Sequence, residues 1–474
     1  MLAAARITHC MSSPAAPLLE HATRDLARFA AALRYEDLPR AVVDHAKLCL
    51  LDGIGVCLHG ATLPWTRLLH QVVLAEGARP AVSLWGTGQQ GSWAQAALAN
   101  GTAGHAFEMD DIHKESVLHP NSLTSPIALG YAEARGATGR QMLAAIVTGY
   151  ECGTRVGNAA TTALFLNGFH PQGTSGTIVA AATAGLMLGL DAVQMQNAFG
   201  IAGSCAAGLM AAQEGAMVKR LHAGRAGESG VRAAELAARG FTGISDIFEA
   251  PYGGFLSSLS RTPRPEKLTA GLGETWEVLN TGFKMYPTVT SIHAALDALR
   301  AIMAAGGLRA EDIERIEVGI GHMTHVHCAW PYKPAGITAA QMNLFYGLAV
   351  TAVQGQVTAA AFTEDQLAAA DLMAFIPRIT AHEDAGLEAM GPAFRHACRM
   401  VVTTRDGRSL RHEELHRRAS PENPVSAAEV EAKFRSNLNG ILSRDEQDTV
   451  VRCVEAFETT ADFASLFAVL GRAR

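Results

Sequence analysis

From about residue 17 to residue 259 the chain repeats one pattern: apolar side chains recur three and four positions apart, in segments bounded by Gly, Pro, Ser or Asp. That spacing puts the apolar residues on one face of an α-helix, whereas the alternation typical of strands is nearly absent here. The clearest helical segments are 19–33, 41–59, 92–106, 125–135, 139–157 and 229–239. The many small residues, 46 glycines among them, suit close contacts between helices.

The pattern changes after about residue 279. Apolar residues alternate with other residues over 316–320, which predicts a half-buried strand. A run of β-favouring residues at 399–404 is followed by Asp406-Gly407 and another short run, which predicts a hairpin. Between these strands, Thr363 with Gln366 forms a capping-box pattern and predicts the start of a helix.

The C-terminal residues are helical in pattern again. Ser426 with Glu429, and Ser443 with Glu446, predict two further capped helices, which we expect to return to the first domain. We therefore predict a mainly α fold with a large all-helical domain built from both chain ends and a smaller α+β lid domain. The predicted ranges are 17–279 and 415–474 for the helical domain, 280–414 for the lid domain, and 1–16 for an N-terminal tail.

Composition excludes several classes of function. The net charge of −6 and the absence of a basic patch argue against a nucleic-acid partner. No apolar run reaches the roughly 18–20 residues of a membrane span, and the first residues lack a secretory-signal pattern. The eight cysteines are scattered and form no C-x-x-C pair, so no zinc ribbon or iron–sulfur cluster is indicated. We expect a cytoplasmic protein.

The first candidate site is the polar segment 105–119. It contains the histidines His105, His113 and His119 and the acids Glu108, Asp110 and Asp111. Titratable groups at this density beside an apolar helix are costly to bury, which indicates an active site. A solvated helix end is one alternative. A divalent metal site is another, but no H-E-x-x-H spacing is present, so we predict no metal.

Three later segments also carry polar groups. His170 precedes Thr174 and Ser175, at a predicted helix start whose free N–H groups would attract a carboxylate. The third segment has Lys219, Arg220, His222 and Arg225, a cationic cluster suited to a polyanionic small molecule. The fourth has Lys284, Tyr286 and, further on, His293, where the second domain begins. Taken alone, the second segment could equally be an ordinary helix cap. The third could equally be a solvated positive face of a helix.

Together the four segments resemble a known family. The order H-A-F-E-M-D-D…H-P, then G-F-H-P-x-x-x-x-G-T, then K-x-L-H-x-G-x-A, then K-x-Y-P, resembles the MmgE/PrpD family over about residues 20–460. That family includes 2-methylcitrate dehydratase, cis-aconitate decarboxylase and iminodisuccinate epimerase. The resemblance implies a large helical domain with a small α+β lid, a homodimer, and no cofactor.

The resemblance also implies roles for individual residues. The catalytic residues are then Glu108, His119, His170 and Lys219. Substrate binding is predicted for His222, Arg220, Thr174, Ser175, Lys284, Tyr286, His105 and Asp111. Two positions depart from the decarboxylase branch: Ile112 stands where that branch has Thr, and Val289 where it has His.

The predicted function is that of a cofactor-independent hydro-lyase, similar to 2-methylcitrate dehydratase, on a small di- or tricarboxylate. Its chemistry would begin with proton transfer at a carbon α to a carboxylate. Lys219, supported by Arg220 or Arg225, would neutralise the substrate carboxylates. An epimerase or isomerase of a dicarboxylate is the main alternative. The departures at Ile112 and Val289 argue against cis-aconitate decarboxylation, and a non-catalytic carboxylate-binding protein is a rival of another class.

Overall fold

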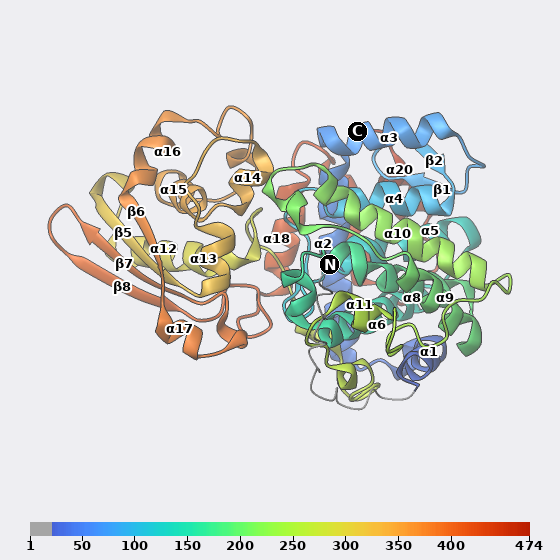
Figure 1. Cartoon of the computed structure of the whole chain (residues 1–474). Coiled ribbons are helices and arrows are strands. Elements are labelled where there is room, and N and C mark those ends of the chain that lie inside the picture. The colour runs from blue at the N-terminus through green and yellow to red at the C-terminus, as the bar shows by residue number, and fades with distance from the viewer. Residues whose placement is uncertain (1–20) are drawn as a thin grey trace, which may run out of the picture.

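The computed structural model describes residues 21–474, so the predicted tail over residues 1–16 lies outside the described part of the chain. The chain forms two lobes side by side (Figure 1). The larger lobe consists of the helices from the first half of the chain together with the last ones, and the smaller lobe holds the four-stranded sheet. This confirms the predicted fold class, a mainly α protein with a smaller α+β domain.

Each of the six predicted helical segments corresponds to a helix of the larger lobe, although α6 and α10 are longer than predicted. The helices of this lobe are α1 (Ala22–Ala32), α2 (Arg40–Ala61), α3 (Pro64–Glu76), α4 (Trp93–Gly104), α5 (Asn121–Arg135), α6 (Gly139–Leu166), α7 (Pro171–Thr174), α8 (Gly176–Leu188), α9 (Ala192–Ser204), α10 (Val218–Ala237), α11 (Phe255–Leu259), α18 (Ala427–Asn437), α19 (Arg444–Glu455) and α20 (Ala464–Gly471). Among the described residues, no helix is both long and apolar enough to cross a membrane.

Small residues bring the central helices of this lobe unusually close together. A Cβ atom added to Gly224 on α10 would lie 2.2 Å from the carbonyl oxygen of Leu98 on α4, and one added to Gly230 would lie 2.6 Å from that of Thr177 on α8. Both distances are shorter than a real Cβ contact, so only glycine fits. Helix α10, which carries Lys219, is therefore held in place by backbone contact with its neighbours.

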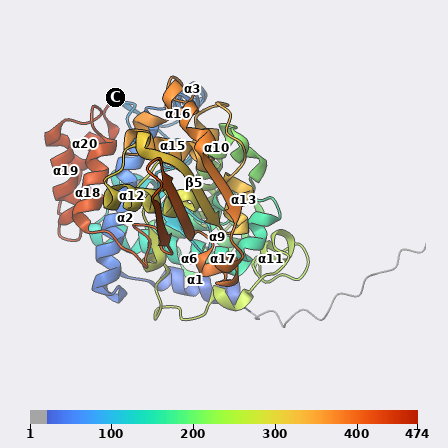
Figure 2. The same ribbon diagram turned by 90° about the vertical axis from the view of Figure 1, so that its left-hand side faces the viewer.

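The C-terminal helices pack against α2, as Figure 2 shows at one side of the molecule. Phe434 of α18 and Val450 of α19 are fully buried in the same apolar core as Leu50 of α2. The two predicted helix caps are confirmed: Ser426 and Ser443 each accept a hydrogen bond from the backbone N–H three residues later. The larger lobe is thus built from both ends of the chain.

The smaller lobe contains a sheet with strand order β6-β5-β7-β8, in which only the β5–β6 pair is parallel. Its apolar face packs on α12 and α15. The hairpin predicted at Asp406-Gly407 is confirmed, with Gly407 at a φ of 86°. The elements of this lobe are β5 (Ile313–Ile320), β6 (Ile379–Glu383), β7 (Cys398–Thr404), β8 (Ser409–Glu414), α12 (His293–Gly306), α13 (His322–Cys328), α14 (Ile337–Met342), α15 (Leu344–Gln354), α16 (Ala370–Phe375) and α17 (Ala385–Ala389).

The helix predicted to begin at Thr363 does not form there. Residues 364–368 make a turn, and the next helix, α16, starts at Ala370. The side chain of Gln366, which would complete the capping box, instead accepts a hydrogen bond from the Gln354 side chain at 3.0 Å. The contact between Gln354 and Gln366 has replaced the capping box between Thr363 and Gln366 on which the prediction rested.

Two short strand pairs interrupt the helices of the larger lobe. In one, β1 (Val82–Leu84) pairs with β2 (Gln89–Gly91). In the other, β3 (Ile112–His113) pairs with β4 (Thr281–Gly282). The second pair matters for function because it fixes the first polar segment of the sequence beside the fourth, which lie about 170 residues apart in the chain.

The close approach of α10 and α4 makes a stability prediction. Replacing Gly224 by Ala should lower the free energy of unfolding by about 1–3 kcal/mol or more, because the added methyl group meets backbone atoms that cannot move aside. Gly176→Ala is the matched control: its added Cβ first meets the end of the Leu123 side chain, at 3.2 Å. Denaturant unfolding measures both variants, and equal stability of the two would contradict the packing argument.

Candidate active site

A small cavity lies where the two lobes meet, and both lobes contribute to its walls. The centre of a water-sized molecule can occupy about 90 Å³ of it, which is room for several water molecules at about 10–15 Å³ each on this measure. Charged and imidazole side chains dominate one part of the wall, and apolar side chains the rest. The polar residues that the larger lobe contributes include Glu108, Lys114, His119, His170, Lys219 and Lys284, and those of the smaller lobe include His327, Arg395 and His396.

Glu108 is the centre of a buried charge cluster. One of its carboxylate oxygens accepts hydrogen bonds from Lys219 and, at 2.6 Å, from Arg220; the other accepts one from Lys284 at 2.9 Å. Burial opposes the ionised form of Glu108, but the three cations outweigh it and hold the pKa of this carboxyl well below its usual range. Burial lowers the pKa of Lys219 to about 8, although Glu108 counteracts that shift.

The backbone around Glu108 is held from two distant parts of the chain. Glu108 itself has a φ of 56°, a left-handed conformation that non-glycine residues rarely adopt. On one side, the carbonyl of Phe107 accepts a hydrogen bond from Gln341 of the smaller lobe at 2.9 Å. On the other, the carbonyl of Met109 accepts one from Lys433 of α18 at 2.7 Å. Such strain persists only where the surroundings fix the conformation, and it concentrates at functional sites.

His119 is fixed in one tautomer by its neighbours. Its Nδ1 lies 2.5 Å from the backbone carbonyl oxygen of Asp111, which can only accept a hydrogen bond, so Nδ1 carries the proton. The lone pair therefore resides on Nε2, and the side chain lines the cavity. Burial lowers the pKa of His119 to about 3, so the imidazole is neutral at physiological pH. A neutral histidine with a free Nε2 can act as a general base.

Asp110 lies behind His119 and organises a second histidine. Its carboxylate is 2.6 Å from Nδ1 of His105 and 3.5 Å from Nδ1 of His119. Burial opposes its ionised form, but these histidines and Lys284 lower the pKa of Asp110. The imidazole of His105 is fully buried and packs between His119 and His170, with ring centroids 5.0 Å and 5.7 Å away.

His170 and His222 form a coupled pair. Their Nδ1 atoms are 2.9 Å apart, so one nitrogen must donate and the other must accept. Burial lowers the pKa of both imidazoles, that of His222 to about 4. His170 lines the cavity, and the half-buried His222 lies behind it, toward solvent.

His105, Asp110 and His119 lie close enough together to be considered as metal ligands. In the present arrangement, however, Nδ1 of His105 is within hydrogen-bond distance of Asp110, and Nδ1 of His119 donates to the Asp111 carbonyl. A metal ion would therefore have to bind the two histidines through Nε2, which is free on His119 and has no partner on His105. The hydrogen bonds that are present orient His119 with its Nε2 toward the cavity.

The cavity brings most of the predicted site residues together. Glu108, His119, His170, Lys219 and Lys284 line it. The predicted substrate-binding residues Arg220, His105 and His222 lie directly behind these, where each contacts or packs against a lining side chain.

Four predicted substrate-binding residues lie elsewhere. Asp111 points into the helical core, where its carboxylate accepts hydrogen bonds from the Tyr150 hydroxyl at 2.5 Å and the Asn121 backbone at 3.2 Å. Burial, the largest effect, raises the pKa of Asp111. Tyr286 lies outside the cavity and donates to Asp297 at 2.5 Å.

Thr174 and Ser175 do not form an open helix start. The helix already begins at Pro171, so the backbone N–H of Thr174 bonds to the His170 carbonyl at 3.1 Å. The Thr174 hydroxyl bonds to the same carbonyl at 3.0 Å. The donors of Thr174 are therefore not free for a carboxylate, as the predicted role required, whereas the buried Ser175 hydroxyl has no hydrogen-bond partner among the described residues. Arg225, proposed as a possible support for Lys219, pairs instead with Glu228.

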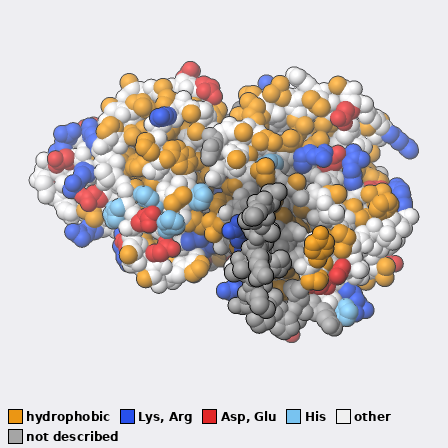
Figure 3. Space-filling model, in the orientation of Figure 1, with side chains coloured by type: hydrophobic (Ala, Val, Ile, Leu, Met, Phe, Trp, Pro, Cys, Tyr) orange, Lys and Arg blue, Asp and Glu red, His pale blue; other side chains and the backbone are white. Residues whose placement is uncertain are grey.

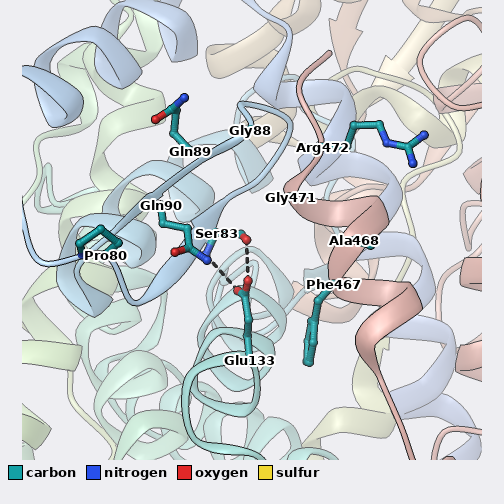
Figure 4. Close-up of a pocket in the computed structure, with 10 residues that line it drawn as sticks. All are labelled: Pro80, Ser83, Gly88, Gln89, Gln90, Glu133, Phe467, Ala468, Gly471 and Arg472. Atoms are coloured by element: carbon teal, nitrogen blue, oxygen red, sulfur yellow. Dashed lines mark hydrogen bonds between the residues drawn. The ribbon is translucent and has the colours of Figure 1, made fainter.

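A larger and more open hollow lies between the β1–β2 hairpin, α5 and α20 (Figure 4). The carboxylate in its wall, Glu133, accepts hydrogen bonds from the hydroxyl and backbone N–H of Ser83, at 2.5 Å and 2.9 Å. Arg472 at its rim pairs with Glu446. The lining residues of this hollow include no histidine or lysine, so it offers no acid–base pair.

Histidines also gather on the outer surface of the smaller lobe (Figure 3). Among them, His322 and His325 of α13 both approach one oxygen of Glu383, at 3.0 Å and 3.4 Å. The His322 side chain is 63% exposed, and exposed pairs of this kind contribute little to stability. The buried cavity remains the candidate active site.

Comparison with known proteins identifies the family of this chain. The model of the MmgE/PrpD N-terminal domain matches residues 24–268, and that of the MmgE/PrpD C-terminal domain matches residues 286–459. The chain belongs to the MmgE/PrpD family. Similar proteins include a cis-aconitate decarboxylase-like protein of Aspergillus oryzae, 30% identical, with 94% of this chain and 97% of that protein covered. Cis-aconitate decarboxylases of Aspergillus terreus and Homo sapiens are 27% and 25% identical, over 94% and 96% of this chain and 95% of each relative.

Sequence reasoning missed several residues of this MmgE/PrpD cavity. Lys114, Arg395 and His396 line it. Lys114 lies within the polar segment 105–119 but is not among the predicted residues, whereas Arg395 and His396 belong to no motif, and the only local signal there is a position just before a predicted strand. Ile112 and Val289, the two departures from the decarboxylase pattern, also line the cavity. The two positions at which this chain differs from the decarboxylase pattern therefore lie on the wall of the candidate site.

The charge cluster makes a stability prediction. Glu108→Gln would leave Lys219, Arg220 and Lys284 buried together without their shared carboxylate, so the free energy of unfolding should fall by about 3–5 kcal/mol. Glu413→Gln, which breaks an exposed pair with Arg399, is the control and should change it by less than about 1 kcal/mol. Denaturant unfolding compares them; a Glu108→Gln protein as stable as the control would show that the cluster does not need this carboxylate.

Proposed function

We propose that this MmgE/PrpD protein is a cofactor-independent lyase, in the first place a hydro-lyase, that acts on a small polycarboxylate. The observation that carries the proposal is the pairing, in one buried cavity, of surplus lysines with a histidine whose Nε2 is free. The lysines suit an anionic substrate, and the histidine suits proton abstraction at a carbon α to a carboxylate.

Lys219 and Lys284 would bind the carboxylate beside the carbon that reacts. Both contact Glu108, and Lys284 also lies 3.6 Å from Asp110, so two carboxylates face the three positive charges of Lys219, Lys284 and Arg220. A substrate carboxylate would supply a third negative charge. When the α-proton leaves, charge develops on that carboxylate, and fixed ammonium groups at this position would stabilise it without reorganisation.

The two cavity histidines would divide the proton transfers between them. His119 Nε2 would remove the α-proton, because its Nδ1–H is held by the Asp111 carbonyl. If His222 donates to Nδ1 of His170, the proton of His170 is on Nε2; as it passes to a leaving hydroxyl group, His170 would take the proton of His222, which water on the solvent side would replace. Loss of the α-proton from one carbon and of the hydroxyl group from the next, together one water, would then give an unsaturated acid.

Decarboxylation is the second candidate. It is supported by the relatives, which are named cis-aconitate decarboxylases and align over almost the whole chain. His170, with its proton on Nε2, would then supply a proton to carbon after loss of carbon dioxide. Against it stand Ile112 and Val289, two apolar side chains on the cavity wall at positions where the resemblance implies Thr and His in the decarboxylase branch.

One assay separates these reactions. Purified protein is incubated in D₂O with a panel of di- and tricarboxylates that includes 2-methylcitrate and cis-aconitate, and NMR follows the carbon-bound protons. Water loss would support the hydro-lyase, and carbon dioxide release the decarboxylase. Deuterium exchange with inversion would identify an epimerase, whereas binding without any reaction would leave a carboxylate-binding protein and overturn the proposal.

His119 is the test of the mechanism within that assay. His119→Gln should lower kcat by about 10²–10⁴-fold, because the general base is gone, while substrate analogues still bind. His322→Gln, on the exposed surface of α13, is the matched control and should keep full activity. A His119→Gln enzyme with unchanged kcat would show that the base is another residue.

The pH profile should show the ionisation of Lys219. Its pKa is lowered to about 8, so the charged form that binds the substrate carboxylate is lost as the pH rises through that value, and kcat/KM should fall. Lys219→Arg keeps the positive charge throughout and should remove this alkaline fall. Rates measured from pH 6 to 10 decide the matter: a wild-type profile that stays flat to pH 10 would contradict this role of Lys219.

A further inference from the structure

Gln341 of the smaller lobe lies directly behind the charge cluster, although it belongs to no sequence motif. Its side chain is fully buried near the end of α14. The amide Nε2 donates a hydrogen bond to the Phe107 carbonyl at 2.9 Å, and Oε1 accepts one from Nη2 of Arg220 at 3.0 Å. Its backbone carbonyl accepts a third, from the Val289 N–H at 2.9 Å. One side chain of the smaller lobe thus binds two separate parts of the larger lobe.

These contacts close a ring of hydrogen bonds around Glu108. Arg220 binds the Glu108 carboxylate through Nη1 at 2.6 Å and Gln341 through Nη2. Gln341 in turn binds the carbonyl of Phe107, the residue that precedes Glu108. A side-chain amide has a donor and an acceptor side by side, so it satisfies both partners at once. A carboxylate could not donate to the carbonyl, and an apolar side chain could satisfy neither partner.

Gln341 also determines how Arg220 uses its two Nη atoms. The guanidinium is buried, and its Nε has no hydrogen-bond partner among the described residues. Because Gln341 occupies Nη2, Glu108 receives Nη1 alone and keeps room for the two lysines that also bind it. Without the amide, Nη2 would be left unpaired, and a bidentate pair with Glu108 is the nearest way to satisfy it. That pair would compete with the lysines for the carboxylate.

The left-handed backbone at Glu108 depends on the same amide. Its φ is 56°, and the carbonyls on both sides of it accept hydrogen bonds. Lys433 binds the carbonyl of Met109 from within the larger lobe, whereas Gln341 binds that of Phe107 from the smaller lobe. Strain of this kind persists only where the surroundings fix it. The conformation of Glu108 is therefore fixed on both sides only while α14 is in contact.

We propose that Gln341 is a positioning residue: it divides the guanidinium of Arg220 between the two lobes and so keeps the Glu108 carboxylate available to the two lysines. This inference rests on the proposed function and deepens it, because it names the residue through which the smaller lobe sets the substrate-binding lysines. Gln341 is not among the residues that line the cavity, so it would act through its neighbours and not by contact with substrate.

The effect on Lys219 has a definite sign. Burial lowers its pKa to about 8, and Glu108 acts in the other direction, so weaker contact with Glu108 would lower the pKa further. The charged form of Lys219 would then be lost at a lower pH. The other cations that act on it also lower its pKa, and the histidines near it are neutral because burial lowers the pKa of each. These groups are Arg220, Lys284, His105, His170 and His222.

Gln341→Met, which is similar in size but makes neither side-chain hydrogen bond, is the principal test. Titration calorimetry follows the binding of tricarballylate, a carboxylate with no hydroxyl group to lose, from pH 6.5 to 10. In the wild-type protein the affinity should fall with a midpoint near pH 8. In Gln341→Met the midpoint should lie about one pH unit lower, as expected when an opposite charge moves away. The variant's kcat/KM, for the substrate found in the D₂O assay, should fall about 10–100-fold.

Asn343→Leu is the matched control. Asn343 is a buried amide two residues further along, and its Nδ2 donates to the Trp330 carbonyl at 2.8 Å. Its Oδ1 accepts from the Tyr346 N–H at 3.0 Å, and both partners belong to the smaller lobe. The variant therefore loses two hydrogen bonds of the same segment outside the ring. It should keep the wild-type midpoint and kcat/KM even if it is less stable.

Arg220→Lys breaks the ring from its other side and covers the case in which Gln341→Met does not fold. An ammonium group keeps the charge but has no fork with which to join Glu108 to Gln341. This variant should also lower kcat/KM about 10–100-fold. Adding Gln341→Met to it should cause little further loss, because both changes break one ring.

The outcomes distinguish this inference from the proposed function. If Gln341→Met keeps the wild-type midpoint, or Arg220→Lys the wild-type kcat/KM, the positioning role is wrong while the proposed function stands. Equal effects of Gln341→Met and Asn343→Leu would also overturn it, since they would assign Gln341 a structural role only. If the wild-type protein neither binds tricarballylate nor converts any carboxylate of the panel, the proposed function fails and this inference fails with it.

Discussion

The carboxylate of Glu108 is the interaction on which the rest of the site depends. With an effective dielectric constant of about 20, each charge pair near 3 Å has an attraction of about 5–6 kcal/mol, which is comparable to the cost of burying one ion. Several partners are therefore needed to keep these groups charged, and Glu108 has three. The same carboxylate connects α10, through Lys219 and Arg220, to the segment after β4, through Lys284.

This cluster requires helices that do not move relative to one another. The glycines at 224 and 230 let α10 contact the backbones of α4 and α8, so the two cations at its start have a fixed distance to Glu108. The bond from Lys433 to the Met109 carbonyl adds the C-terminal helices to the same framework, and Asp52 balances the charge of Lys433 at 2.6 Å. The small residues of the core thus fix the helix positions on which the charge cluster of the site depends.

Much of this was predictable from sequence, because helical periodicity and capping boxes are local signals. The caps at Ser426 and Ser443 and the Asp-Gly hairpin needed no tertiary information. Thr363 shows the limit, since Gln366 bonds to a distant residue instead. The predicted site residues that line the cavity belong to dense polar motifs. Arg395 does not, and only the contact between the two lobes gives it a place in the site. Asp111 and Thr174 lie outside the cavity wall for another reason: a polar residue near a motif can satisfy its hydrogen bonds within the core.

The groups that move protons are shared by all the reactions under consideration, so they do not select among them. A base at His119, a cationic carboxylate site and an acid at His170 serve dehydration, decarboxylation and epimerisation alike. The reactions differ in which bond of the substrate breaks. That choice would depend on which substituent of the bound substrate lies beside the acid, His170. Ile112 and Val289 offer no hydrogen bond through their side chains, so a leaving group beside them would receive no help there. In the proposed mechanism the departing group instead faces His170, which would supply its proton.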